Sequence, residues 1–416
     1  MNNEFYKNNR KTLYDTLQDG TVLLSFAGKP HHQSADAYFP LFVNRNFVYL
    51  TGLDGAEPDG FILMAEKVQG EIKETLFILP ADKMAERWSG RRLKPDEIDE
   101  MGGLKCTEDV AKFHEYFHRT MNSGRIHAVA LDIWRDLKEH ELGGTHKFAH
   151  RLQHEHPDVE LINYHYQLRK QRTIKQPCEI ETMKKALTYT KAGIEAMMEV
   201  SEPGMYEYQY KAAYDHALTS RGILSPAFPS IISAGENNFC IHYYGYRGQA
   251  QDGDMILNDV GASYDGICTD VSRGWPCNGV FSEKQRALYE CAYKTSEYMF
   301  SIIKPGMAMP DVDKTIKEYC GNELIKIGLL DDIENVGKYM WHGGAHHVGY
   351  DVHDHVFIDG PIEAGMVFCV DVGIYVEEWG IGFRLEDNCL VTEDGCENLS
   401  ADIPRTIDEI EAKMRS

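Results

Sequence analysis

The sequence predicts a protein of two mixed domains, a smaller α/β domain followed by a larger α+β domain that contains an internal repeat. Three observations support this fold class. The chain has 416 residues, which is more than a single hydrophobic core usually serves. Its first part alternates apolar runs with helical patterns, as α/β domains do. Its second part contains the same succession of elements twice, which indicates a duplicated unit.

The first domain is predicted from the stretch between residues 39 and 165, where the apolar runs FVYLTGL, GFILMA, ETLFILP and RIHAVALDI lie between helical patterns. Around RKQRTIKQPCEIE the composition turns basic and polar, and Pro177 then stands at the start of a long amphipathic stretch. Proline is favoured at the first position of a helix. We therefore expect an N-terminal domain over residues 1–172 and a C-terminal domain over residues 173–416.

The repeat in the second domain has two halves with the same order of parts. In the first half, helical stretches flank EPGM at 202–205, and His242 and the strand pattern GDMILNDVG follow. In the second half, helical stretches flank KPGM at 304–307, and the histidine cluster HGGAHHVGYDVHDH at 342–355 and the strand pattern AGMVFCVDVG follow. His242 therefore corresponds to a member of the histidine cluster.

Four acids occupy matched positions in the repeat. Asp259 corresponds to Asp371, each within DVG, and Asp270 corresponds by order to Glu386. Duplicated units commonly pack about a pseudo-two-fold axis, so we expect the four carboxylates to converge. Converging buried carboxylates require either protons or cations, and four of them carry more negative charge than one nearby arginine can neutralise. A pair of divalent metal ions with a histidine ligand satisfies them, and oxygen-rich ligation favours Mn²⁺, with Zn²⁺ or Co²⁺ as alternatives.

The first pair of acids is expected on a hairpin. DVGASYDGICTD has the pattern of two strands joined at a turn that contains Asp265 and Gly266, because Asp-Gly favours tight hairpin turns. Asp259 and Asp270 would then lie opposite or nearly opposite each other. Cross-strand neighbours lie about 5 Å apart, close enough to share a cation.

Composition excludes several partners. The chain has 43 Lys and Arg against 65 Asp and Glu, a net charge of −22, which repels nucleic acids and anionic membranes. The N-terminal residues have no apolar segment typical of a signal peptide, so we expect a cytoplasmic protein. The ten cysteines form no CxxC pair and are interpreted as reduced packing residues.

Four motifs of the second domain resemble those of the pita-bread metallopeptidases, in particular the aminopeptidase P (Xaa-Pro aminopeptidase) branch: NDVGASYDGICTDVSRGWP, HGGAHHVGYDVHD, EAGMVFCVDVGIY and GFRLEDNCLVT. In the first domain, NRNFVYLTGLDGAEPDGFILM and ADKMAERWSGRRL are similar to the non-catalytic domain of that branch. The resemblance implies a pita-bread (creatinase/aminopeptidase-like) catalytic domain. The first domain would serve oligomerisation and substrate access.

Carried over by position, the resemblance implies that the metal ligands are Asp259, Asp270, His346, Asp371 and Glu386, with Asp270 and Glu386 bridging two ions. It further implies supporting roles for His242, His342, His353, Arg384 and Tyr375. The three histidines would contact substrate or stabilise the reaction intermediate, the arginine would support the metal ligands, and the tyrosine would line the pocket. His347 and His355 receive no role.

The implied activity is hydrolysis of the N-terminal Xaa-Pro bond of peptides by a hydroxide bound between the two metal ions. The proline preference rests on the resemblance alone. Prolidase, which cleaves only dipeptides, shares the motifs and is the alternative. The branch also implies a homodimer or homotetramer, because the region of WSGRRL, which includes Trp88, would reach a neighbouring subunit's active site.

One position departs from the family pattern. The chain has Asp371 and Val372 where the family has Glu and Pro. Aspartate is one methylene shorter, so metal affinity or rate could be reduced. A catalytically weak or inactive peptide-binding relative is therefore a second alternative, although Asp259 shows that aspartate can serve in the matching position of the repeat.

A different protease signature is HEYFH at 114–118, which matches HExxH. On a helix this motif presents two histidines to zinc and a glutamate as base. Val110, Phe113 and Phe117 predict a helix with an apolar stripe that the histidines only flank. A third zinc ligand would have to come from Glu139 or Glu141, so we expect a chance match.

Overall fold

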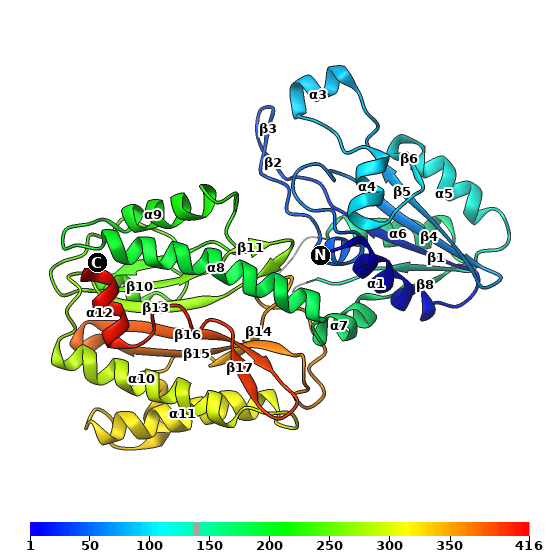
Figure 1. Cartoon of the computed structure of the whole chain (residues 1–416). Helices are drawn as coiled ribbons and strands as arrows, with labels where there is room; N and C mark the ends of the chain where they lie inside the picture. The colour runs from blue at the N-terminus through cyan, green and yellow to red at the C-terminus, as the bar shows by residue number, and fades with distance from the viewer. Residues whose placement is uncertain (136–141, 416) are drawn as a thin grey trace. The chain divides into compact units, whose positions relative to one another are not determined.

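The computed structural model describes residues 1–135 and 142–415 and divides into two compact units, Met1–Gln171 and Arg172–Ser416 (Figure 1). The first unit is built on a six-stranded mixed sheet in the order β6-β5-β4-β1-β7-β8. Its strands are β1 (Thr21–Phe26), β4 (Ile62–Val68), β5 (Glu71–Ile78), β6 (Thr107–Asp109), β7 (Ala128–Leu131) and β8 (Glu160–Asn163). β4 pairs antiparallel with both β1 and β5, and the other three pairings are parallel.

Helices complete the core of the first unit. Phe113 and Phe117 of α5 (Phe113–Met121) and Leu152 of α6 (Gly144–Glu155) pack against apolar residues of β1, β4, β5 and β7. A second helical group is formed by α1 (Asn3–Asp15), α2 (Arg45–Thr51) and α4 (Pro95–Gly102), which contact one another. The remaining elements are the short pair β2 (His32–Ser34) and β3 (Ala37–Tyr38), α3 (Lys83–Ser89) and α7 (His165–Thr173).

The second unit contains the predicted repeat. Its first half comprises α8 (Pro177–Val200), α9 (Glu207–Thr219), β9 (Ile231–Ala234), β10 (Met255–Val260) and β13 (Val271–Pro276), and the strands form a sheet in the order β13-β10-β9. Pro177 occupies the first turn of α8, and the side chain of Glu179 accepts a hydrogen bond from the backbone of Gln176. This capping box begins the helix where the sequence predicts it.

The second half has the same parts in the same order. It comprises α10 (Glu283–Ile302), α11 (Met309–Lys326), β14 (Ala345–His347), β15 (Val367–Val376), β16 (Ile381–Val391) and β17 (Cys396–Asn398), with α12 (Ile407–Arg415) closing the chain. The strands form a sheet in the order β14-β15-β16-β17. In Figure 1, α8 and α9 (green) lie on one side of the strands and α10 and α11 (yellow) lie on the other. Among the described residues, no helix has the length and apolarity to cross a membrane.

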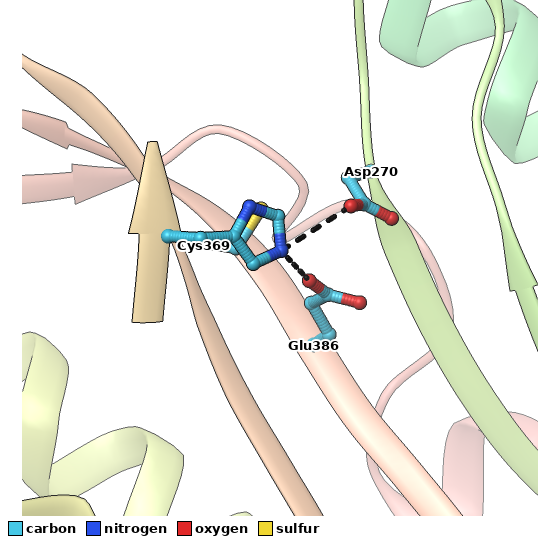
Figure 2. A group of neighbouring side chains, drawn as sticks. Asp270, Cys369 and Glu386 are labelled. Carbon is cyan, nitrogen blue, oxygen red and sulfur yellow. Dashed lines mark ion pairs between the residues drawn. The ribbon is translucent and has the colours of Figure 1, made fainter. Parts of the chain in front are cut away.

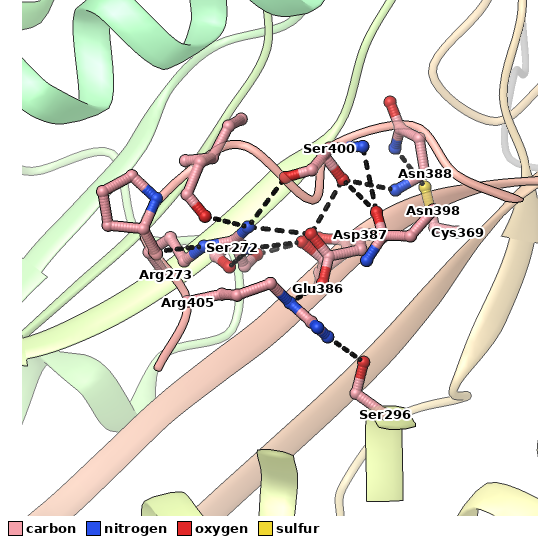
Figure 3. A network of polar contacts seen from close by, with 12 residues as sticks. Ser272, Arg273, Ser296, Cys369, Glu386, Asp387, Asn388, Asn398, Ser400 and Arg405 are labelled. Carbon is pink, nitrogen blue, oxygen red and sulfur yellow. Dashed lines mark hydrogen bonds and ion pairs between the residues drawn. The ribbon is translucent and has the colours of Figure 1, made fainter. Parts of the chain in front are cut away.

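A buried charge network joins the two halves (Figure 3). The side chains of Arg273 on β13 and Asp387 on β16 are fully buried, with 2.8 Å between Nη2 and Oδ1. Asp387 also lies 3.2 Å from Nε of Arg405 and accepts a hydrogen bond of 2.7 Å from Ser400. Arg273 donates a further hydrogen bond of 2.8 Å to the carbonyl of Glu386. The network therefore fixes β13 against β16, next to the predicted metal ligands.

Candidate metal centre

The first pair of predicted acids lies on the expected hairpin. The short strands β11 (Ser263–Tyr264) and β12 (Ile267–Cys268) pair, and Asp265 and Gly266 between them have φ of 47° and 81°. Asp259 on β10 lies directly opposite Ser272 on β13, which is two residues beyond Asp270. Residues two apart on a strand share a face. Asp259 and Asp270 are therefore diagonal neighbours, which confirms the prediction that they lie nearly opposite each other.

The second pair comes from β15 and β16, where Asp371 lies directly opposite Glu386. In the same sheet His346 on β14 lies opposite Cys369 on β15. Because side chains alternate along a strand, Cys369 and Asp371 face the same side. Asn388, opposite Cys369, faces that side together with Glu386.

The four carboxylates converge, and the pKa values of three of them are raised as a result. Burial raises the pKa of Asp259, Asp270 and Asp371, and the nearby charge of Glu386 raises all three further. One oxygen, Oδ1, of each of these three aspartates is buried without a hydrogen-bond partner among the described residues. Buried carboxylates arranged in this way need protons or cations.

His346 points into the acids. Its Nε2 lies 3.3 Å from Oε1 of Glu386 and 3.5 Å from Oδ2 of Asp270 (Figure 2). Burial alone would lower the pKa of His346, but the contact with Glu386 raises it. Burial alone would raise the pKa of Glu386, but His346 and a hydrogen bond of 2.8 Å from Ser272 lower it. The imidazole of His346 thus partly neutralises the two acids that it contacts.

A chain of contacts connects the two DVG acids. Nδ1 of His342 lies 3.2 Å from Oδ2 of Asp371, and Nε2 of His342 lies 2.9 Å from the hydroxyl of Tyr375. Arg384 donates to that hydroxyl at 2.9 Å and to Oδ2 of Asp259 at 3.0 Å. Predicted metal ligands from both halves of the repeat are therefore linked through three side chains that the sequence analysis singles out.

The remaining predicted residues differ in their surroundings. His353 packs its ring against that of His346, with centroids 4.4 Å apart, and burial lowers its pKa to about 4. His242 is exposed, and its ring stacks on Tyr244 with centroids 6.5 Å apart. His347 alternates with His346 along β14 and packs on Phe368, so it contributes to packing.

Three residues near the acids have no role in the sequence analysis. Cys369 is buried, as expected of a packing cysteine, but its sulfur lies among the metal-binding candidates. Burial, together with Glu386, raises the pKa of its thiol. Ser272 donates to Glu386, and Asn388 contacts both Asp270 and Cys369. Their signal in the sequence is a spacing of two residues from a predicted acid.

The donor set fits a divalent metal centre. One donor atom from each of Asp270, His346, Cys369 and Glu386 lies within 4.8 Å of the other three. Carboxylate and imidazole groups are the usual ligands of Mn²⁺, Zn²⁺ and Co²⁺ in hydrolases. The uncompensated buried aspartate oxygens beside them require positive charge, which such ions provide.

The HEYFH segment does not form a comparable site. It lies on α5, and His114, Glu115 and His118 are all exposed. Glu115 pairs with Arg119 of the same helix at 2.6 Å. The two candidates for a third ligand, Glu139 and Glu141, lie outside the described residues. Within the described part of the chain, these histidines belong to no cluster of potential metal ligands.

Comparison with known proteins agrees with the geometry. Residues 181–393 match the metallopeptidase family M24, and residues 6–129 match the aminopeptidase P N-terminal domain. A curated relative, the Xaa-Pro aminopeptidase of Escherichia coli (strain K12), is 28% identical, with 98% of this chain and 97% of the relative covered. The human Xaa-Pro aminopeptidase 3 is 27% identical, with 94% and 80% covered.

Solved structures agree as well. A Bacillus anthracis protein assigned to aminopeptidase P has a TM-score of 0.95 and 35% identity, with 100% of this chain and 99% of that chain covered. Zinc-substituted E. coli aminopeptidase P in complex with product has a TM-score of 0.88 and 27% identity, with 100% and 98% covered. These likenesses confirm the predicted fold class. The chain therefore belongs to metallopeptidase family M24 and is a metal-dependent aminopeptidase of the aminopeptidase P group.

Proposed function

We propose that this chain removes the N-terminal residue from peptides whose second residue is proline. The observation that carries the proposal is the convergence of four carboxylates, three of them buried, with His346 in a chain whose relatives along their whole length are Xaa-Pro aminopeptidases. Peptides longer than two residues are the proposed substrates, in contrast to the dipeptides of a prolidase.

Five residues would hold two divalent metal ions, namely Asp259, Asp270, His346, Asp371 and Glu386. Asp270 and Glu386 would share an ion with His346, because both lie within 3.5 Å of the same imidazole nitrogen. The oxygen-rich donors favour Mn²⁺ in at least one position. When bound, such ions supply Lewis acidity, which polarises a carbonyl and lowers the pKa of water.

The surrounding histidines would act as neutral hydrogen-bond donors. Burial lowers the pKa of both His342 and His353 to about 4, so neither ring carries charge at neutral pH. A neutral ring at His353 can donate to the oxygen of the scissile carbonyl as negative charge develops on it. His342 holds Asp371 and Tyr375 in place through its two ring nitrogens. His242 is exposed and would contact the peptide.

Aromatic surface next to His342 suits a proline ring. Trp341 is partly exposed and stacks on Tyr375, with ring centroids 4.6 Å apart and planes 13° apart. Phe239 lies 6.0 Å from the ring of Trp341 and is also partly exposed. A pyrrolidine ring is apolar and lacks an N–H donor when its nitrogen is acylated. Such a ring can pack here without leaving a polar group unsatisfied.

We also propose that the chain works as a homodimer or homotetramer. Trp88 on α3 is 88% exposed, and Met84 of the same helix is 60% exposed. Large apolar side chains exposed together commonly mark interfaces. The measurement is the molecular mass in solution, with Trp88→Ala expected to shift the protein toward monomer.

The activity is tested by assaying metal-loaded protein against a matched series of Xaa-Pro-Xaa tripeptides, Xaa-Pro dipeptides and Xaa-Ala-Xaa tripeptides. We expect cleavage of the Xaa-Pro-Xaa peptides, its loss in the chelated enzyme and its loss in Asp270→Ala. Asp394→Ala, which removes an exposed acid of the same unit, is the control and should behave as wild type. Cleavage of dipeptides alone would identify a prolidase instead. Absence of both bound metal and turnover would support a peptide-binding relative instead.

A further inference from the structure

The thiol of Cys369 lies inside the candidate metal centre. Cys369 is fully buried on β15, opposite Asn388 on β16. Its sulfur, one oxygen each of Asp270 and Glu386, and a nitrogen of His346 lie within 4.8 Å of one another. Figure 2 shows Asp270 and Glu386, each joined by an ion pair to the imidazole of His346. This is a set of four donors of three chemical kinds.

The surroundings of the sulfur indicate a ligand. Asp270 is 3% exposed and Glu386 is 2% exposed, and Oδ1 of Asp270 has no hydrogen-bond partner among the described residues. The group therefore carries buried negative charge that protons or a cation must compensate. Asn388 donates a hydrogen bond to the sulfur of Cys369 at 3.4 Å. An N–H donor aimed at sulfur is the support that a metal-bound thiolate needs.

Asp371, whose side chain is one methylene shorter than the family's glutamate, lies outside the donor group that contains His346. The four-donor group includes Cys369 but not Asp371. Oδ2 of Asp371 lies instead 3.2 Å from Nδ1 of His342. Among the described residues, the sulfur of Cys369 is therefore the fourth member of a donor group with Asp270, His346 and Glu386.

We propose that Cys369 binds, as a thiolate, the cation held by Asp270, His346 and Glu386, and that its sulfur makes this position select Zn²⁺ or Co²⁺ over Mn²⁺. The proposal rests on the metal centre of the proposed function. On binding, the S–H bond breaks, its electron pair forms the sulfur–metal bond, and the proton leaves to solvent. No electron transfer is involved.

Ligand chemistry gives the selectivity. Thiolate is a soft donor that favours Zn²⁺ and Co²⁺, whereas Mn²⁺ prefers oxygen. The other position, near Asp259, has only carboxylate donors among the candidate ligands. The two positions would therefore differ in metal preference, and a protein supplied with both Zn²⁺ and Mn²⁺ would bind one of each.

The test is the electronic spectrum of the protein loaded with Co²⁺. Wild type is expected to show a thiolate-to-cobalt charge-transfer band in the near ultraviolet, and Cys369→Ser is expected to lack it. Cys389→Ser is the matched control, because Cys389 is also fully buried and lies on β16 next to Asn388 but faces the other side of the strand. Cys389→Ser should keep the band.

Competitive titrations give a second measure. Cys369→Ser should lower the affinity for Zn²⁺ by about tenfold or more and leave the affinity for Mn²⁺ within about threefold of wild type. Equal losses for both ions would overturn the proposed selectivity.

X-ray absorption of wild type loaded with one equivalent of Zn²⁺ keeps the proposal testable if Cys369→Ser does not fold. A sulfur neighbour at about 2.3 Å from zinc supports the proposal, and only nitrogen and oxygen neighbours overturn it. A protein that binds two metal ions and cleaves Xaa-Pro-Xaa peptides without a sulfur ligand refutes the role of Cys369 alone. A protein that binds no metal refutes the proposed function together with it.

Discussion

Asp371 on β15 lies directly opposite Glu386 on β16, so two carboxylates occupy one cross-strand pair inside the protein. Opposed like charges destabilise a sheet, and burial strengthens the effect. Burial and the charge of Glu386 together raise the pKa of Asp371. With both acids ionised the pair is unfavourable, and a bound cation would relieve it.

Asp371→Asn should therefore change the stability of the metal-free and metal-loaded proteins in opposite directions. Without metal at pH 8, removal of the buried charge should raise the free energy of unfolding on the order of 1 kcal/mol. With metal, the variant should show a smaller increase in melting temperature than wild type, because a ligand is lost. Thermal unfolding with and without chelator measures both. An unchanged response to metal would contradict a ligand role for Asp371.

Ser272→Ala should weaken metal binding without a matching loss of fold. Ser272 donates to Oε2 of Glu386 at 2.8 Å, and removal of such a support typically costs about tenfold in metal affinity. Ser233→Ala is the control, because it deletes another buried hydrogen bond, to Asn238 at 2.6 Å. Calorimetric titration of both variants should show reduced affinity for Ser272→Ala only. A similar reduction in the control would mean that the effect is general destabilisation.

Tyr375→Phe should reduce turnover by breaking the link between His342 and Arg384. The hydroxyl lies 2.9 Å from each of these side chains, and phenylalanine keeps the ring packed on Trp341. We expect kcat/KM to fall by about tenfold, with bound metal retained. Tyr289→Phe removes a buried hydroxyl that bonds to the carbonyl of Arg405 and should keep wild-type kcat/KM. Unaltered kinetics in Tyr375→Phe would show that the link has no part in catalysis.

The internal repeat made most of the candidate site predictable. Duplication pairs Asp259 with Asp371 and Asp270 with Glu386 in the sequence, and the structure brings all four together. The hairpin pattern also predicted that Asp259 and Asp270 lie nearly opposite each other. The fold class followed from the same pattern, because each half has two helices followed by strands.

Contacts that depend on how separate strands align were not predictable. His346 meets Cys369 because β14 pairs with β15 in one register, and periodicity within a single strand carries no information on that register. The bond from Ser272 to Glu386 depends on the packing of β13 against β16. HEYFH shows the reverse case, in which a local pattern matches a motif but its side chains remain exposed.

Asp387→Ala should destabilise the second unit strongly. It would leave the guanidinium of Arg273, which is fully buried, without its 2.8 Å carboxylate partner, and an unpaired buried charge typically costs about 3–5 kcal/mol. Urea unfolding measures the loss. The double variant Arg273→Met with Asp387→Leu removes both charges and should recover most of it. A double variant as unstable as the single one would show that the network acts through packing.

Glu179 should make stability depend on pH. Burial raises its pKa from 4.5 to about 7, although the backbone of Gln176 and the charge of Lys175 lower it; Asp354 raises it and Arg172 lowers it. An acid with a raised pKa contributes stability that is present below its ordinary pKa and is lost as the pH rises through about 7.

Glu179→Gln keeps the capping acceptor without the charge. Its unfolding free energy should match that of wild type near pH 4 and exceed it by up to about 3 kcal/mol near pH 8. Urea unfolding at the two pH values measures the difference. Parallel profiles of wild type and variant would contradict the assignment of this pH dependence to Glu179.

Consecutive residues of β13 and β16 recognise each other in matched order. Ser272 donates a hydrogen bond to Glu386, and Arg273 forms an ion pair with Asp387. The two acids are consecutive residues of β16, so their side chains lie on opposite faces of that strand. A slip of either strand by one position would turn the arginine toward the metal ligands and leave an acid without its partner. These two contacts therefore favour one alignment of β13 and β16 during folding. In that alignment Arg273 neutralises Asp387, and Glu386 remains available to bind metal.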